Sequence, residues 1–243
     1  MAQVHPFRVV GFAAWSTTLS DSDGWTSWSA VDNKLGESCV PNAAPAALRR
    51  RATPLGQKLL AAALSLEDVT EARYVLSSQH AEFARVPALL DVIRRREAVS
   101  PADFSMSVHH GLAGLLSIAT HSRRGHSAIS AGSESFCYGL LEVAACLAEG
   151  HDRRVIQLHY DEDPGDGFGA LVPEWERGSS IVLALACATA TSGCGIPIQM
   201  GMRTRVGQTA RSGHALRFLD FVRSDIASAV SFGDRMVWEW QRV

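Results

Sequence analysis

A five-residue turn, AGSES at 131–135, joins a short β-like run to a strongly apolar helix. Many α/β enzymes hold a nucleophile at such a strand-to-helix turn, because the free amides of the helix's first turn stabilise negative charge. Ser133 and Ser135 place hydroxyl groups here, which raises the hypothesis of an acyl hydrolase or acyltransferase acting through Ser133. The turn lacks the G-x-S-x-G form, in which glycines on both sides of the serine allow close packing.

A serine nucleophile also needs a base and a carboxylate that orients the base. The chain offers four candidate bases, His109, His110, His126 and His159, and two candidate carboxylates, Asp161 and Asp163. Because the sequence contains nine histidines, a chance partner is easy to find. The serine hydrolase is therefore the alternative hypothesis and not the leading one.

The sequence predicts neither a metal site nor a cofactor. Four histidines lie close together, at His109, His110, His121 and His126. Adjacent histidines on a helix point in different directions, and the other two occupy a basic, turn-like segment. The five cysteines are odd in number and have no C-x-x-C spacing, which excludes a disulfide framework and a zinc site: Cys39, Cys137, Cys146, Cys187 and Cys194. The segment DPGDGFG at 163–169 matches neither a P-loop nor a dinucleotide fingerprint.

Composition places the chain among ordinary globular proteins. Its 243 residues are 47% apolar and 20% charged, which is enough to bury a sizeable core. A formal net charge of −2 gives no overall attraction to nucleic acid or to a membrane surface. No apolar run reaches the roughly 18 residues of a membrane span, and residues 1–6 lack a signal-peptide pattern. We therefore expect a cytoplasmic protein.

Strand-like and helix-like segments alternate along the chain, which predicts an α/β domain with a mixed, mostly parallel sheet flanked by helices. The predicted strands are 7–14, 72–78, 127–130, 154–159 and 180–188, with 196–203 pairing beside the last of these. The predicted helices are 54–66, 81–97, 136–148 and 214–230. The segment 20–29 is predicted as a loop or short helix, and 34–52 as irregular.

The order of these parts resembles the N-terminal half of a β-ketoacyl synthase, a thiolase-type fold. The resemblance is carried by VVGF at 9–12, by the helix, strand and helix of 54–97, and by SPADFSMSVHHGLAGLLSI at 100–118. Downstream, GHSAISAGSESF at 125–136 takes the place of the strand and turn that deliver the active cysteine. ERGSSIVLALA at 176–186 stands where the family has a glycine-containing turn and a buried strand.

Two departures from this family indicate a protein without condensing activity. The position of the cysteine nucleophile falls on Glu134, or on Ser133 with a one-residue slip, so no thiol is supplied. The two histidines of the synthases come from a C-terminal half, and this chain is expected to be a single domain, 1–243, without that half. Glu134 is instead expected to interact with the free amides of the following helix, which stabilises a protein by about 0.3 to 1 kcal/mol.

The chain resembles most the short chain-length factors of aryl polyene and xanthomonadin-type pigment pathways. That resemblance implies a noncatalytic subunit that forms a heterodimer with a full-length ketosynthase and meets an acyl carrier protein through the complex. Ser127, Ala128, Ile129 and Ser130 would then form the strand that pairs across the two-fold axis. Residues 101–106 would line the partner's acyl tunnel, with Phe104 and Met106 at its floor.

The resemblance has two smaller implications. His110 replaces an asparagine of the family and would contact the floor of the vestigial site. The basic cluster Arg49, Arg50 and Arg51 would receive an acidic carrier protein, and a solvated surface is the simpler interpretation of this cluster.

Overall fold

The computed structural model describes residues 2–19, 24–31, 34–36, 42, 44–165, 168, 178–207 and 213–243. An 11-stranded mixed sheet runs through this part of the chain, in the order β10-β11-β9-β2-β8-β7-β5-β6, with β1 on β9 and with β3 and β4 beyond β2. Its strands are β1 (Ala2–Gln3), β2 (Phe7–Ser16), β3 (Trp25–Ser29), β4 (Lys34–Gly36), β5 (Arg73–Ser77), β6 (His126–Ile129), β7 (Arg154–Asp161), β8 (Ile181–Thr189), β9 (Ile196–Thr204), β10 (Ser228–Phe232) and β11 (Met236–Arg242).

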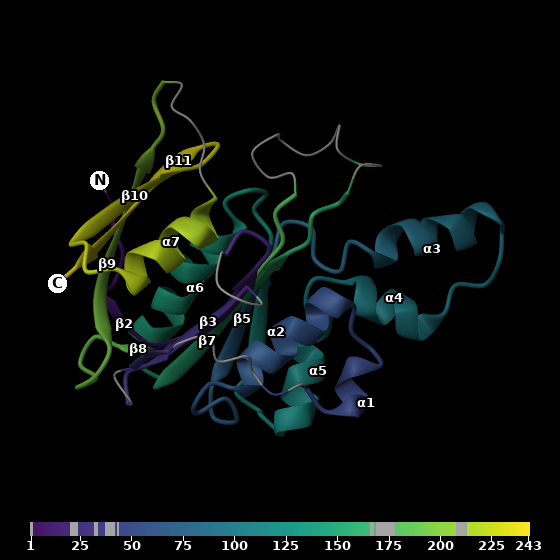
Figure 1. Cartoon of the computed structure of the whole chain (residues 1–243), viewed down its shortest axis with the longest axis horizontal. Coiled ribbons are helices and arrows are strands. Elements are labelled where there is room, and N and C mark those ends of the chain that lie inside the picture. The colour runs from purple at the N-terminus through teal and green to yellow at the C-terminus, as the bar shows by residue number, and fades with distance from the viewer. Residues whose placement is uncertain are drawn as a thin grey trace.

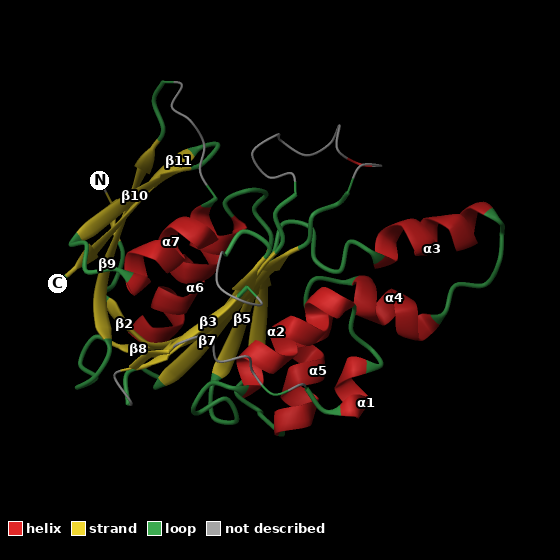
Figure 2. Cartoon of the chain, viewed as in Figure 1, coloured by secondary structure: helices red, strands yellow, loops and turns green. Residues whose placement is uncertain are grey.

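Helices cover both faces of the sheet, as Figures 1 and 2 show. They are α1 (Ala46–Arg49), α2 (Pro54–Leu64), α3 (Arg85–Arg94), α4 (Pro101–Ser107), α5 (Gly111–Thr120), α6 (Ser135–Ala148) and α7 (His214–Arg223). One apolar core lies under α6 and α7, and a second lies under α2 and α5. The pair α3 and α4 projects away from the sheet (Figure 1), and α3 buries none of its residues.

Local sequence explains where the main helices begin. The side chain of Thr53 accepts a hydrogen bond from Gly56 N at 3.1 Å, and Pro54 fills the first position of α2, where no amide hydrogen is needed. Ser100 and Pro101 begin α4 in the same way. On α6, Gly139 lets the helix approach β5 and β7 closely, because a Cβ there would lie 2.4 Å from Gln157 Nε2.

The predicted α/β class with a mixed, helix-flanked sheet is confirmed, but the direction of pairing needs correction. Parallel pairing is confined to β5 with its neighbours β6 and β7. The other strand pairs among the described residues are antiparallel. The strand predicted at 196–203 exists as β9, yet it pairs with β2 and β11 and not with β8.

Three segments differ from the sequence prediction. Residues around Trp25 and Trp28 form strand β3 and not a loop or helix, because they pair with β2. The helix predicted over 81–97 begins at Arg85, with Pro87 in its first turn. The helix predicted over 214–230 ends at Arg223, and the chain then forms the hairpin β10–β11, which the sequence pattern did not predict. Cys39, and much of the segments predicted at 20–29, 34–52 and 163–169, lie outside the described residues.

Candidate functional site

The turn before α6 is covered by the hairpin β10–β11. Glu134 occupies the N-cap position of α6 but makes no side-chain cap bond to it. Its Oε1 accepts hydrogen bonds from the amides of Arg235 at 2.6 Å and Met236 at 3.1 Å, and the residue is 2% exposed. The expectation that this carboxylate interacts with the amides of α6 was therefore wrong, because the amides of the hairpin bind it.

Neither serine of the turn is arranged as a nucleophile. Ser133 Oγ donates to Asp234 Oδ2 at 2.9 Å, so its partner is a carboxylate on the hairpin and not an imidazole. Ser135 is buried, and its Oγ donates to the carbonyl of Gly132 at 2.6 Å and accepts from Ala131 N at 2.9 Å. These bonds close the turn on itself, so the geometry does not favour the serine hydrolase.

The sulfur nearest to the turn is also unsuited to nucleophilic attack. Cys137 lies one turn into α6 and is fully buried. Burial, together with the charge of Glu134, raises the pKa of the Cys137 thiol well above its ordinary value. The thiol therefore stays protonated, and a protonated thiol is a poor nucleophile.

The histidines named as candidate bases lie in separate places. His110 stacks on His126 with ring centroids 6.0 Å apart, beside strand β6. His159 lies on β7, and Nε2 of His109 has no hydrogen-bond partner in the described part of the chain. Across the described residues, no group of three or more potential ligands could hold a metal ion, and His121 ends α5 in a left-handed conformation.

A cavity of about 330 Å³ opens beside the turn, at the carboxyl ends of β5 and β7. Six of the side chains around it are Ser133, Phe136, His159, Asp161, Glu162 and His214. His159 and Asp161, both predicted as hydrolase candidates, do come together, with Nε2 and Oδ2 3.5 Å apart. His214 was not predicted as a site residue, because a single histidine at the start of a helix gives no signal in the sequence.

Strand β6 forms one edge of the sheet and pairs only with β5 in the described chain. Ser127 and Ile129 are half-buried, whereas Ala128 and Ser130 are exposed. Ser127 Oγ donates to Glu142 Oε1 at 2.9 Å, which holds the strand against α6. Of the four residues predicted to pair with a partner, three therefore lie in this edge strand, and Ser130 directly follows it.

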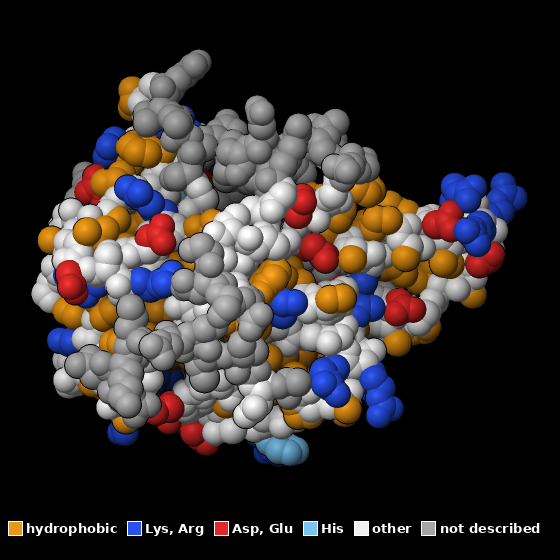
Figure 3. Space-filling model, in the orientation of Figure 1, with side chains coloured by type: hydrophobic (Ala, Val, Ile, Leu, Met, Phe, Trp, Pro, Cys, Tyr) orange, Lys and Arg blue, Asp and Glu red, His pale blue; other side chains and the backbone are white. Residues whose placement is uncertain are grey.

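The two residues predicted at the tunnel floor point to different places. Met106 is half-buried and packs against the core under α2 and α5. Phe104 is 61% exposed and, with Leu90 and Ile93, lines an apolar groove of about 520 Å³ between α3 and α4. Figure 3 shows hydrophobic side chains over this arm and charged ones at its tip. His110 is exposed, and Arg49, Arg50 and Arg51 are exposed as well.

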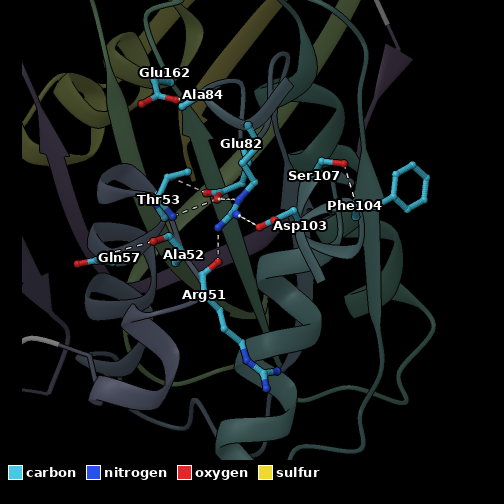
Figure 4. A network of polar contacts seen from close by, with 12 residues as sticks. Arg51, Ala52, Thr53, Gln57, Glu82, Ala84, Asp103, Phe104, Ser107 and Glu162 are labelled. Atoms are coloured by element: carbon cyan, nitrogen blue, oxygen red, sulfur yellow. Dashed lines mark hydrogen bonds and ion pairs between the residues drawn. The ribbon is translucent and has the colours of Figure 1, made fainter. Parts of the chain in front are cut away.

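A buried carboxylate ties this arm to the body of the protein (Figure 4). Glu82 is 1% exposed and accepts hydrogen bonds from the amide of Thr53 at 3.1 Å and from its hydroxyl at 2.8 Å. Arg85 Nε donates to the same carboxylate at 2.9 Å, and Arg85 Nη1 lies 3.4 Å from Asp103 Oδ1 on α4. One ion-pair network thus joins the starts of α2 and α3 to α4.

Comparison with known proteins agrees with this architecture. A family model described as "Beta-ketoacyl synthase, N-terminal domain" matches residues 25–241. No curated protein matches the chain. Within the described residues, no helix is both long and apolar enough to cross a membrane.

Solved structures that are similar in fold include a ketosynthase complex with its chain length factor, a second ketosynthase/chain length factor and a β-ketoacyl synthase. One is a ketosynthase (ApeO) in complex with its chain length factor (ApeC) from Xenorhabdus doucetiae, with a TM-score of 0.76, 21% identity, and coverage of 97% of this chain and 99% of that one. The ishigamide ketosynthase/chain length factor gives a TM-score of 0.56 at 12% identity, covering 82% of this chain and 67% of that one. A β-ketoacyl synthase from Burkholderia phymatum gives 0.53 at 9% identity, covering 90% and 69%.

These likenesses show a thiolase-type ketosynthase fold, as the resemblance in sequence implied. The family model spans far more than half of the sequence and includes the turn before α6 and the edge strand β6. The chain therefore belongs to the family of β-ketoacyl synthase N-terminal domains.

Proposed function

We propose that this chain is a noncatalytic chain-length factor, which pairs with a full-length β-ketoacyl synthase and shapes the acyl cavity of the complex during polyene elongation. The observation that carries the proposal is the free edge of β6, next to a turn that holds no nucleophile. An unpaired edge strand is a template for pairing with another chain, and soluble proteins seldom leave one uncovered. The acyl chain would reach the complex on an acyl carrier protein.

The chemistry of the turn supports a noncatalytic role. A condensing enzyme carries the growing acyl chain on a thiolate, whereas the matching position here is Glu134. That carboxylate is buried and bonded to two hairpin amides, so it holds the hairpin in place. The nearby Cys137 is buried and protonated. Among the described residues of the turn, no thiolate is therefore available to carry a covalent acyl intermediate.

The backbone amides and carbonyls of β6 that do not bond to β5 point away from the sheet, toward its open edge. Tyr74 N donates to Gly125 O, and Ser78 N donates to Ile129 O, so the odd-numbered residues face β5. In a parallel pair the alternate residues then direct their amides and carbonyls outward. Ala128 and Ser130 would therefore donate and accept across the interface with the synthase.

Helix α5, whose start contacts β6, exposes an apolar side chain, which supports a protein partner. Ile118 on α5 is 70% exposed. Gly114, one turn earlier on the same helix, has no atom within 4 Å of the position that a Cβ would take. The stacked pair His110 and His126 links the start of α5 to β6. Exposed apolar surface of this kind is typical of the centre of the interface in a permanent heterodimer.

The experiment is co-expression with a full-length ketosynthase from the same source, followed by size-exclusion chromatography. Wild-type chain should elute with the synthase as a heterodimer. Ala128→Pro removes an outward-facing amide and leaves the β5 ladder intact, so it should abolish co-elution. Ala128→Val keeps the amide and is the matched control. Co-elution of the proline variant at the wild-type level, or elution of the wild-type chain as a lone monomer, would contradict the proposal.

A further inference from the structure

The cavity beside the turn has the features of a binding site that the proposed pairing does not use. It lies at the carboxyl ends of two parallel strands, β5 and β7, where open α/β sheets bind their ligands. Its volume of about 330 Å³ suits a molecule with a single ring, near the lower end of small-molecule pockets. The walls are partly apolar, from Phe136, Ile181 and Leu216.

Two buried imidazoles, His159 and His214, form part of the polar lining of the cavity, together with the half-buried His80 and the carboxylates of Asp161 and Glu162. His159 is 4% exposed, and its Nδ1 lies 3.0 Å from Ser77 Oγ. His214 is 3% exposed; its Nδ1 lies 2.6 Å from Ser231 Oγ, and its Nε2 has no partner in the described part of the chain. An unpaired buried polar atom destabilises a fold, and a bound ligand that pairs with it offsets that cost.

Asp161 is held rigidly at the cavity wall. Its Oδ1 accepts hydrogen bonds from Ser78 Oγ at 2.9 Å, Gln79 N at 2.7 Å and His80 N at 3.0 Å. Its Oδ2 is left for His159, at 3.5 Å, and for the cavity. A carboxylate fixed in this way is a preorganised acceptor, so a ligand that donates a hydrogen bond meets no cost of ordering it.

The two carboxylates of the described lining disfavour an anionic ligand. Asp161 and Glu162 line the cavity, and the described lining residues include no lysine or arginine. Burial lowers the pKa of His159 and lowers that of His214 to about 4, so neither imidazole offers a positive charge at neutral pH. A carboxylate or phosphate would therefore lose its hydration without gaining a cationic partner.

We propose that this cavity binds a small molecule without negative charge that carries a hydrogen-bond donor, such as a hydroxyl or an ammonium group, on an apolar body of one ring. The donor lies between Asp161 and the two imidazoles, and the apolar body lies against Phe136, Ile181 and Leu216. This inference needs no synthase, because every residue in it belongs to this chain.

The test is a titration of the full chain, without a partner, with three probes that share one ring: cyclohexylmethanol, cyclohexylmethylamine and cyclohexanecarboxylate. The alcohol should bind saturably in calorimetry and shift the imidazole NMR signals of His159 and His214. The carboxylate should bind at least about tenfold more weakly, because Asp161 and Glu162 repel it. Binding of the carboxylate as tight as that of the alcohol, or no saturable binding of the alcohol, would overturn the proposal.

Variants locate the site. Asp161→Asn should narrow the difference in affinity between alcohol and carboxylate, whereas Asp220→Asn, on the exposed face of α7, should leave it unchanged. His214→Phe keeps a ring in place and removes the unpaired nitrogen, so it should weaken the binding of the alcohol. Leu216→Trp fills the cavity from a half-buried position without removing a polar group, and it should abolish binding. Unchanged binding by the folded tryptophan variant would place the alcohol elsewhere and refute the assignment.

Discussion

Glu134 and Gly233 lie against each other where the hairpin β10–β11 closes over the start of α6. A Cβ on Gly233 would come within 2.4 Å of Glu134 Oε1 and 2.6 Å of its Cδ. The carboxylate is fixed by two hairpin amides, so it has little room to move away. Glu134, which the resemblance places at the family's nucleophile position, is thus part of the packing between a helix and a hairpin.

This contact predicts that Gly233→Ala destabilises the folded chain. Overpacking of a closed contact costs about 1 to 3 kcal/mol, so the free energy of unfolding in urea should fall by about that amount. Gly114→Ala is the matched control, because Gly114 lies in a helix with no neighbouring atom within 4 Å of its missing Cβ. The control should be neutral or stabilising by up to about 1 kcal/mol. Equal effects of the two substitutions would argue against close packing at Gly233.

The network around Glu82 predicts unequal roles for its two ion pairs. Arg85→Met leaves a nearly buried carboxylate without its cation, which costs about 3 to 5 kcal/mol in comparable cases. Asp103 is 59% exposed and its pair with Arg85 is screened by water, so Asp103→Asn should cost less than about 1 kcal/mol. Urea unfolding of both variants measures the difference. A larger loss of unfolding free energy for Asp103→Asn than for Arg85→Met would contradict the greater role given to the Glu82–Arg85 pair.

His214 predicts a loss of stability in mild acid. Burial lowers its pKa from 6.5 to about 4 in the folded chain, with His159 as a further cause. Below about pH 6.5 the unfolded chain binds a proton that the folded chain excludes. His214 therefore does not affect the free energy of unfolding above about pH 6.5, and that free energy falls as the pH drops from there toward 4. The loss attributable to this residue is about 3 kcal/mol.

Urea unfolding at a series of pH values tests this dependence. His214→Phe should flatten the fall between about pH 6.5 and 4. The fall should not vanish, because burial also lowers the pKa of His159. His5→Phe, at an exposed position, should leave the profile unchanged. A His214→Phe profile as steep as that of the wild type would mean that the imidazole takes up its proton in the folded state.

The sequence predicted most of the elements that carry buried apolar runs, such as β2, β8 and α6, because burial on two sides leaves a continuous pattern. It failed where pairing decides the structure. Trp25 and Trp28 lie in a strand only because β2 is beside them. Trp238 and Trp240 are two residues apart and fully buried, which is the spacing of a strand that the Gly-Asp turn before them could have revealed.

For the site, the sequence predicted the turn between a strand and the helix α6 but not the partners of that turn. Asp234 and Gly233 lie about a hundred residues after Glu134, and such long-range contacts leave no local pattern. His159 and Asp161 were named for a hydrolase, and the structure brings them together beside a cavity instead of beside a serine nucleophile. Met106 and Phe104 are two residues apart on a short helix, so the sequence could not tell which one faces the core.

That separation gives a prediction about product length. Phe104 is exposed on α4, where it is free to enter the acyl tunnel of a synthase partner, whereas Met106 packs into the core of its own chain. Phe104→Ala should therefore lengthen the product made by the reconstituted complex and leave the unfolding free energy of the chain nearly unchanged. Met106→Ala should leave the product length unchanged and lower the free energy of unfolding. A fully buried methionine loses about 2 to 5 kcal/mol on this substitution, and the loss should be smaller at this half-buried position.

Mass spectrometry of the polyene products and urea unfolding of the two variants, taken together, separate the roles. The complex must first be shown to form with each variant, so that a missing product is not mistaken for a changed length. Identical product distributions from Phe104→Ala and wild-type complexes would remove Phe104 from the tunnel floor while leaving the pairing through β6 intact. A longer product from Met106→Ala alone would instead mean that the helix α4 turns its other face toward the synthase in the complex.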